Sequence, residues 1–249
     1  MLYFRTGAEA ITEYLTRQST KRMILSAISG PTMRKRNGRA GTERKSVRQK
    51  GKIMEKLWKR LETQMIQSYE SMVKENSDMT VWNQAFDTMA EIVENGRDED
   101  QDFAPELFVL DKSRDFMFNL KVWLNDYMEM LEQEEEQEQL EKVCRKLLEL
   151  FAWKKESPSE IRFRLASSML SLDKKEEAGA FCEKWYGQDK DDPVAATALI
   201  YARIADGKLK DAQKIVDRWL KKDEGYTEEN AELLGAASFL QTVSGNVFA

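Results

Sequence analysis

Apolar residues recur at a fixed spacing of 34 residues in the C-terminal part of this chain. A period of this length fits one pair of antiparallel helices, which must bury its apolar face against a neighbouring pair. The repeat therefore predicts a stack of helical hairpins, in which equivalent positions form the core between successive units. The recurring residues are Leu165, Leu199 and Leu233, Ala178 and Ala212, and Trp185 and Trp219.

The local sequence divides this period into two helices and a turn. The first helix of one unit begins at Asp192–Pro193, because proline is tolerated in the first turn of a helix. Gly207 marks the turn, and residues 212–219 supply the apolar positions of the returning helix. The preceding unit begins at Pro158 and turns at Asp173. This order of signals is typical of a helix–turn–helix repeat.

Residues 140–241 resemble the tetratricopeptide repeat family, and the match is best at Leu199, Gly207 and Ala212. The resemblance implies a concave groove, lined by the first helix of each pair, that binds extended peptides or helices of a protein partner. The groove residues that it implies are Phe163, Ser167, Leu170, Thr197, Tyr201, Ile204 and Ser238. The Lys/Asn carboxylate clamp of chaperone-binding members is not matched, because Phe163 and Thr197 occupy its positions.

Two tryptophans and both cysteines lie at similar positions on the second helices of these units. Trp185 and Trp219 are predicted to be core residues rather than partner contacts, because each hairpin must bury this face against its neighbour. Cys144 and Cys182, 38 residues apart, are the only cysteines, and we expect them to be core thiols. They form neither a disulfide framework nor a zinc motif, which favours a reducing, cytoplasmic location.

Low glycine and proline content favours helices in the rest of the chain. The 12 Gly and 4 Pro among 249 residues are fewer than the many turns of a β-sandwich or barrel require. Apolar periodicity predicts helices over 7–29 and 53–76, and a third helix between Ser77–Asp78 and Asn95–Gly96. The fold class that we predict is all-α.

An acidic run, Glu129–Glu141, separates an aromatic region from the repeats. A buried helix is expected from about Ser113, and another helix over 140–153. The segment 132–139 has no apolar residue, so it is either a solvated extension of a helix or a loop. A solvated helix face is the expected role of the acidic run, with a docking patch for a basic partner as the alternative.

Positive charge is concentrated near the N-terminus. Residues 1–60 contain 16 Lys and Arg but 4 Asp and Glu, whereas the whole chain has a net charge of -5. Residues 30–52 have too little apolar surface to offset their ordering entropy, so a flexible basic arm is expected. The arm could bind the phosphates of RNA or DNA, contact protein, or have no binding role. Its candidate residues are Arg34, Lys35, Arg36, Arg39, Arg44, Lys45, Arg48, Lys50 and Lys52.

The predicted organisation has four parts: an N-terminal helix over 1–29, the basic flexible arm over 30–52, a helical region over 53–135, and tetratricopeptide-like helical repeats over 136–249. The leading hypothesis is a non-catalytic scaffold or adaptor that binds a protein or peptide partner through the repeats. The alternative is a nucleic-acid-associated regulator that uses the basic residues 34–60.

An enzyme that uses paired carboxylates is the third hypothesis. The chain has no histidine, no phosphate-binding loop of the Walker type and no Gly-x-Gly-x-x-Gly motif. We therefore predict no catalytic residues, no metal site and no cofactor. No run of 18 uninterrupted apolar residues is present, so no membrane-spanning helix is expected.

Overall fold

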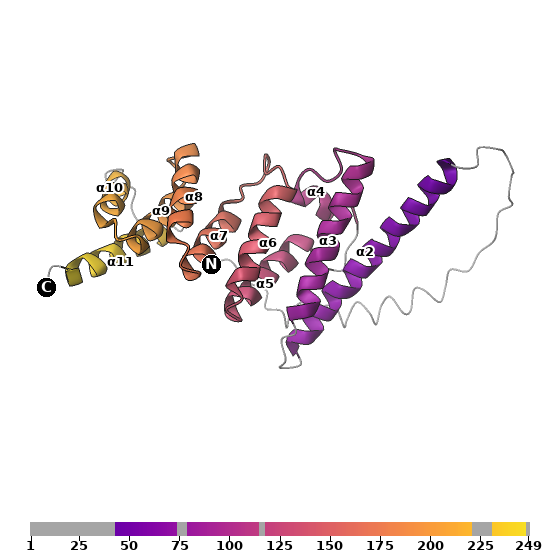
Figure 1. The fold of residues 1–249 in the computed structure, drawn as a ribbon, viewed down its shortest axis with the longest axis horizontal. Coiled ribbons are helices and arrows are strands. Elements are labelled where there is room, and N and C mark those ends of the chain that lie inside the picture. Colours follow the sequence, from indigo (N-terminus) through magenta and orange to yellow (C-terminus); the bar gives the residue numbers. More distant parts are fainter. Residues whose placement is uncertain (1–42, 74–78, 115–117, 221–230, 248–249) are drawn as a thin grey trace. The chain divides into compact units, whose positions relative to one another are not determined.

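The computed structural model describes residues 43–73, 79–114, 118–220 and 231–247 (Figure 1). Over these residues the chain forms helices and no strand, so the predicted all-α fold is confirmed. The helices are α2 (Glu43–Val73), α3 (Met79–Glu99), α4 (Leu107–Lys112), α5 (Leu120–Gln133), α6 (Gln137–Leu150), α7 (Ser159–Ser171), α8 (Lys175–Gln188), α9 (Pro193–Ala205), α10 (Leu209–Leu220) and α11 (Ala231–Val247). The predicted helix over 7–29 and residues 30–42 of the predicted arm lie outside the described residues.

The chain divides into two compact units, with the boundary between Tyr127 and Met128 inside α5. The boundary predicted from the sequence falls between residues 135 and 136, just after this helix. Within the described ranges, none of the helices has the length and apolar character needed to cross a membrane.

Stacked aromatic rings form the core of the first unit. Trp82 on α3 lies nearly parallel to Trp123 and Tyr127 on α5, with ring centroids 5.5 and 5.9 Å apart. All three side chains are fully buried. The indole Nε1–H of Trp123 donates a 2.9 Å hydrogen bond to Ser68 Oγ on α2. Helices α2, α3 and α5 therefore share one core in this unit.

Helix α2 begins at Glu43 rather than near residue 53, so the prediction of a flexible arm is wrong for residues 43–52. The prediction depended on the scarcity of apolar residues in this segment. Arg, Lys, Gln and Glu nevertheless have high intrinsic helix propensity. Most of the residues between Glu43 and Lys52 are of these types.

Helix α3 continues through Asn95–Gly96 to Glu99, so the predicted stop at this pair is wrong. Gly96 is buried, and a Cβ atom at this position would lie 2.2 Å from the ring of Phe103. The absence of a side chain therefore lets Phe103 pack directly on the helix backbone. Close packing, rather than helix termination, explains this glycine.

The buried helix expected from about Ser113 is α5, which begins later than predicted, and the short helix α4 precedes it. Ser113 is the C-terminal cap of α4, and α5 begins only at Leu120. Asn119 caps α5, because its Oδ1 accepts a 3.0 Å hydrogen bond from the Val122 backbone N–H. The carboxylate of Asp111 on α4 accepts a second hydrogen bond, of 2.6 Å, from the Leu120 N–H. These polar groups satisfy the start of α5 and fix its position relative to α4.

The second unit contains the hairpins that the 34-residue period predicts. Helices α7 and α9 begin 34 residues apart, and so do α8 and α10. The turns between the paired helices contain Asp173 and Gly207, with φ of 59° and 71°. Aspartate and glycine are among the residues that tolerate this left-handed conformation. Helix α9 begins at Pro193 as predicted, and Asp192 caps it by accepting hydrogen bonds from the N–H groups of Val194 and Ala195 at 2.9 and 3.2 Å.

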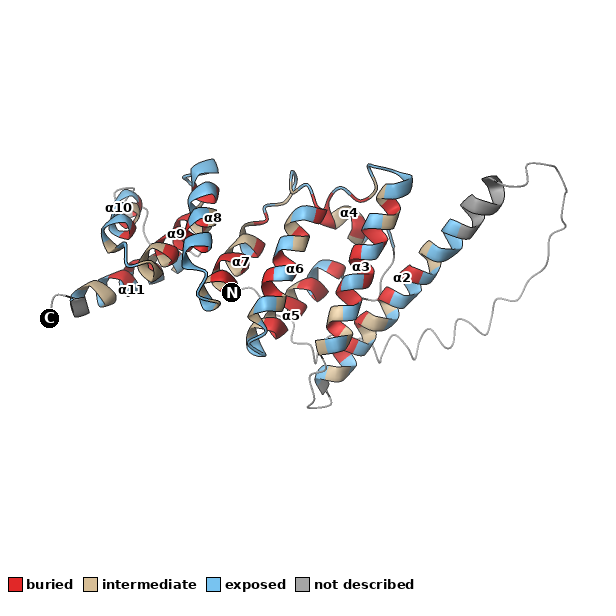
Figure 2. Cartoon of the chain, in the orientation of Figure 1, coloured by how far each residue is buried: buried red, intermediate tan, exposed pale blue. Residues whose placement is uncertain are grey.

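The recurring residues of the sequence form the core of this unit. Figure 2 shows buried residues gathered on the facing sides of these helices. The predicted burial of Trp185 and Trp219 is confirmed, because their exposed fractions are 3% and 9%. The other recurring residues are also buried, namely Leu165, Leu199, Leu233, Ala178 and Ala212. The period therefore corresponds to a repeated packing position and not only to a repeated composition.

Candidate functional site

An apolar pocket of about 470 Å³ lies between helices α7, α9 and α11. Residues on neighbouring turns of α7 and of α9 point into it, because positions three and four apart share one helix face. Its lining residues are Phe163, Ala166, Ser167, Leu170 and Ser171 from α7, Ala198, Tyr201, Ile204 and Ala205 from α9, and Phe239 from α11. The structure thus brings five of the seven predicted groove residues into one pocket: Phe163, Ser167, Leu170, Tyr201 and Ile204.

The other two predicted groove residues lie elsewhere. Thr197 is buried and lines a neighbouring pocket instead. Its hydroxyl donates a 2.8 Å hydrogen bond to the Pro193 carbonyl within α9. Ser238 is exposed and does not line the apolar pocket. The next residue, Phe239, lines it in place of Ser238. The repeat contained a signal for Phe239, because Ser171, Ala205 and Phe239 are spaced by 34 residues and all line the pocket.

Two aromatic rings form one wall of the pocket. The centroids of Tyr201 and Phe239 are 6.1 Å apart, and 48% of Phe239 is exposed to solvent. Burial, and then the nearby carboxylate of Glu232, raise the pKa of Tyr201 above its ordinary value, so its hydroxyl stays neutral at physiological pH. A large exposed aromatic ring beside a preformed pocket offers apolar area to a partner.

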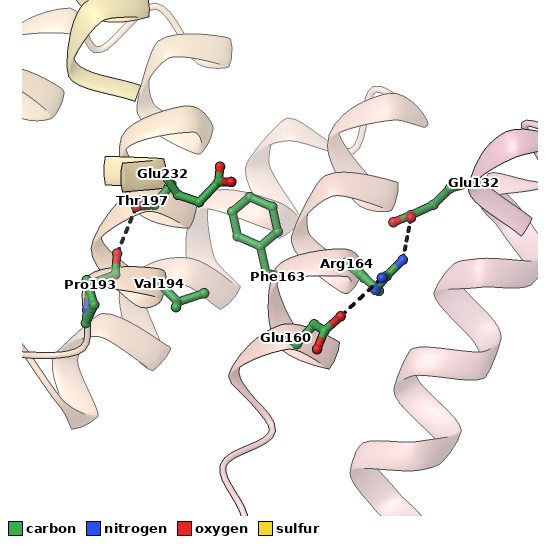
Figure 3. A pocket seen from close by; sticks show the side chains of 8 residues that line it. All are labelled: Glu132, Glu160, Phe163, Arg164, Pro193, Val194, Thr197 and Glu232. Atoms are coloured by element: carbon green, nitrogen blue, oxygen red, sulfur yellow. Dashed lines mark hydrogen bonds and ion pairs between the residues drawn. The ribbon is translucent and has the colours of Figure 1, made fainter. Parts of the chain in front are cut away.

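A second pocket, of about 330 Å³, adjoins the first at Phe163 and is strongly acidic (Figure 3). Its charged lining residues are Glu132, Glu160 and Glu232, with Arg164 as the single cation. Arg164 lies between Glu160, 3.1 Å away, and Glu132, with which it also forms an ion pair. Figure 3 shows the carboxylate of Glu232 on the other side of Phe163 from this ion-pair cluster. Since one guanidinium faces three carboxylates, the pocket has a negative charge.

The acidic run is only partly the solvated face that the sequence predicts. Glu129 and Glu132 contact Arg164, and Glu141 is buried with hydrogen bonds from Lys174 at 2.7 Å and Arg145 at 3.0 Å. Burial by itself raises the pKa of Glu141, but the hydrogen bonds from Lys174 and Arg145 outweigh it and hold that pKa below its ordinary value. These carboxylates therefore connect α5 and α6 to α7 and α8.

Replacing Glu141 by glutamine should lower the free energy of unfolding by about 1–2 kcal/mol at neutral pH, because charged hydrogen bonds contribute more than neutral ones. The partial exposure of the two cations, Lys174 and Arg145, keeps this contribution small. The folded-state pKa is lowered, so this stability is present above the pKa of the unfolded chain and is lost as the pH falls through the lowered value. Urea unfolding at neutral and acidic pH should show a difference from the wild type that narrows in acid. Glu138→Gln, an exposed carboxylate on the same helix, is the control. An equal effect of both substitutions would contradict the ion-pair role.

The basic residues are placed only in part. Arg34, Lys35, Arg36 and Arg39 lie outside the described residues, and Arg44, Lys45 and Arg48 belong to helix α2. Lys50 and Lys52 are exposed on α2. Three basic side chains of this helix lie near carboxylates of the same unit: Lys50 near Glu99 at 3.9 Å, Lys59 near Glu55 at 3.8 Å, and Arg60 near Glu91 at 2.6 Å. Contact with the protein's own acidic groups therefore accounts for part of the basic surface.

Both thiols are buried, Cys144 on α6 and Cys182 on α8. Burial raises the pKa of each thiol to about 12, so neither forms a reactive thiolate at physiological pH. In the described part of the chain, no group of three or more His, Cys, Asp or Glu residues is arranged to hold a metal ion.

The geometry defines an all-α protein with paired helices and an apolar pocket between the first helices of successive pairs. Comparison of the chain with models of protein families, with curated proteins and with solved structures finds no match.

Proposed function

We propose that this protein is a non-catalytic adaptor that holds a segment of a protein partner in the pocket between α7, α9 and α11. The observation that carries the proposal is the convergence of Phe163, Leu170, Tyr201, Ile204 and Phe239 on one preformed pocket. Burial of an aromatic or aliphatic side chain contributes about 1.5–3 kcal/mol. Two or three such side chains of a partner would fill this volume and contribute about 3–9 kcal/mol before the costs of association are subtracted.

The partner segment is amphipathic, with apolar side chains for the pocket and a basic side chain for its acidic neighbour. The two pockets share Phe163, so a continuous segment can reach both. Glu160 already pairs with Arg164, whereas Glu232 has no cationic partner among the described residues. A lysine or arginine of the partner therefore has Glu232 as its nearest available carboxylate. Tetratricopeptide-like groove binding follows the same physical logic, in which side-chain pockets select an extended or helical segment.

A photo-crosslinking amino acid at Ser171, an exposed residue on the rim of the pocket, tests the proposal directly. Crosslinking in lysate of the source organism, after nuclease treatment, should give a discrete protein adduct. The same amino acid at Lys210, which is exposed on α10 and does not line the pocket, is the positional control. Adducts that form equally at both positions would contradict a specific site.

Binding of the identified partner should depend on the aromatic wall of the pocket. Tyr201→Ala and Phe239→Glu are each expected to weaken the affinity by about tenfold or more, which corresponds to about 1.4 kcal/mol. Val122→Glu is a matched control, because Val122 is 52% exposed and Phe239 is 48% exposed, and Val122 does not line the pocket. Calorimetric titration measures these affinities. If Val122→Glu weakened binding as much as Phe239→Glu, the pocket would not be the binding site.

The nucleic-acid hypothesis predicts a different response of binding to salt and to nuclease treatment. Binding through the basic residues 34–60 would weaken steeply with salt and would be lost after nuclease treatment, because phosphate contacts release counterions. Binding in the apolar pocket would be retained under both conditions. The ion pairs of Lys50, Lys59 and Arg60 within their own unit give the nucleic-acid hypothesis less support than the pocket gives the adaptor hypothesis.

A further inference from the structure

A third pocket, of about 300 Å³, lies between the end of α6, the start of α7 and the last turns of α8. It is separate from the proposed partner groove and shares no lining residue with it. Aromatic rings and cations dominate its lining, which contains no carboxylate. The lining residues are Leu148, Phe151, Ala152, Trp153, Arg162, Phe181, Lys184, Trp185 and Gln188.

Arg162 is exceptional among the arginines of the second unit. Within the described residues of this unit, Arg145, Arg164, Arg203 and Arg218 each pair with a carboxylate. Arg162 has no ion-pair partner there, and its guanidinium instead lies over the ring of Trp185, 5.7 Å from the ring centroid. Stacking on tryptophan holds the guanidinium in place and leaves its N–H donors available to a ligand.

A second cation, Lys184, lines the same pocket and also has no carboxylate partner among the described residues. The surroundings make this unusual, because residues 128–249 contain 25 Asp and Glu but only 18 Lys and Arg. Two cations that converge on one cavity repel each other unless an anion lies between them. The pocket is therefore a local site of positive charge in an acidic unit.

Trp153 forms an aromatic wall of the pocket from an unusual backbone conformation. Its φ is 53°, in the left-handed region that bulky residues rarely adopt. Two contacts hold it there: its Nε1–H donates a 3.1 Å hydrogen bond to the Leu147 carbonyl, and its ring meets Phe151 edge-on with centroids 5.9 Å apart. Trp153 and Phe181 are each half-buried, so their rings are partly accessible from the cavity.

We propose that this pocket binds a small anion that carries a planar aromatic ring, with its carboxylate or phosphate group between Arg162 and Lys184 and its ring against Trp153 and Phe181. A guanidinium matches the two oxygens of such a group, and the lysine adds a point charge. Aromatic walls favour a flat ring by stacking or edge contacts. The volume is at the lower end for ligand pockets, which restricts the ligand to about one or two rings.

Titration calorimetry of the full chain with two matched pairs of probes tests the proposal. Indole-3-acetate is compared with neutral indole-3-acetamide, and adenosine monophosphate with neutral adenosine, so that a carboxylate source is distinguished from a phosphate source. At least one anion should bind with a dissociation constant below about 1 mM, and its neutral partner should bind about tenfold more weakly or worse. Absence of binding by both anions, or equal binding of an anion and its neutral partner, would overturn the proposal.

Substitution of the cations locates the binding. Arg162→Gln should reduce the affinity for the bound anion by about tenfold while leaving the affinity for the neutral partner unchanged. Lys184→Gln, at an exposed position, should have an effect in the same direction and serves as the second variant if Arg162→Gln unfolds the hairpin. Lys210→Gln removes a charge from α10 outside the pocket and should have no effect. Equal affinity in all three variants would place the anion elsewhere and overturn the assignment.

Discussion

Replacing Trp185 by alanine is expected to lower the free energy of unfolding by about 3–5 kcal/mol, the cost of truncating a large aromatic residue in a packed core. Trp185 is 3% exposed and belongs to the core shared by α7, α8 and α9. Its loss removes the ring on which Arg162 lies and leaves a cavity that the helices on either side cannot fill without moving toward each other.

Urea unfolding followed by circular dichroism measures this loss. Phe239→Ala is the control, because Phe239 is an aromatic residue of the same unit that is 48% exposed, and its truncation should cost well under half as much. Trp185→Phe should have an intermediate effect, since it keeps an aromatic ring but reduces its volume. If Trp185→Ala and Phe239→Ala were equally destabilising, the repeat position at residue 185 would not be a core position.

Truncating Trp123 to alanine should destabilise the first unit by a similar amount, about 3–5 kcal/mol. Trp123 is fully buried against Trp82 and Tyr127, whose ring centroids lie 5.5 and 5.6 Å from its own. The substitution removes one of the two α5 rings that stack on Trp82 of α3 and also leaves the hydroxyl of Ser68 without its 2.9 Å indole donor. Packing is the larger of the two contributions, because a neutral hydrogen bond contributes about 1 kcal/mol.

A double-mutant cycle separates packing from hydrogen bonding. Trp123→Phe keeps a ring in the stack but loses the indole N–H, so part of its cost should disappear in the Ser68→Ala background. The expected coupling energy is about 0.5–1.5 kcal/mol. A coupling near zero would mean that the hydrogen bond to Ser68 does not contribute, whereas the cost of Trp123→Ala would still measure the stack.

The hairpins were predictable from the sequence because their signals are local. Asp192 caps α9 through N–H groups two and three residues away, and Asp173 and Gly207 close the turns by their own backbone conformation. The resemblance to tetratricopeptide repeats implied five of the ten residues that line the apolar pocket. Phe239 was missed because the groove positions were chosen at Leu170 and Ile204, one residue before the positions that continue to Phe239.

Features that depend on distant partners were not predictable. The carboxylates of the acidic run looked solvated because their cations, Arg164 and Lys174, lie far along the sequence. Gly96 looked like a helix stop because the ring that requires it, Phe103, packs back on the helix only in the folded chain. In the same way, the sequence does not distinguish Arg162 from the other arginines of the second unit, because their carboxylate partners are brought to them by the fold.

The two buried cysteines can report local opening of the helices that carry them, because a thiol reacts only when it is exposed. In the folded state neither Cys144 nor Cys182 presents a thiolate to a disulfide reagent, because both are buried and their pKa is about 12. Reaction therefore requires that α6 or α8 first separate from its neighbours, and the labelling rate gives the free energy of that opening. Since one thiol lies on each helix, peptide mass spectrometry would follow the two helices separately. Equal labelling rates would mean that α6 and α8 open as one cooperative unit. Different labelling rates would show which of the two helices opens at the lower cost in free energy.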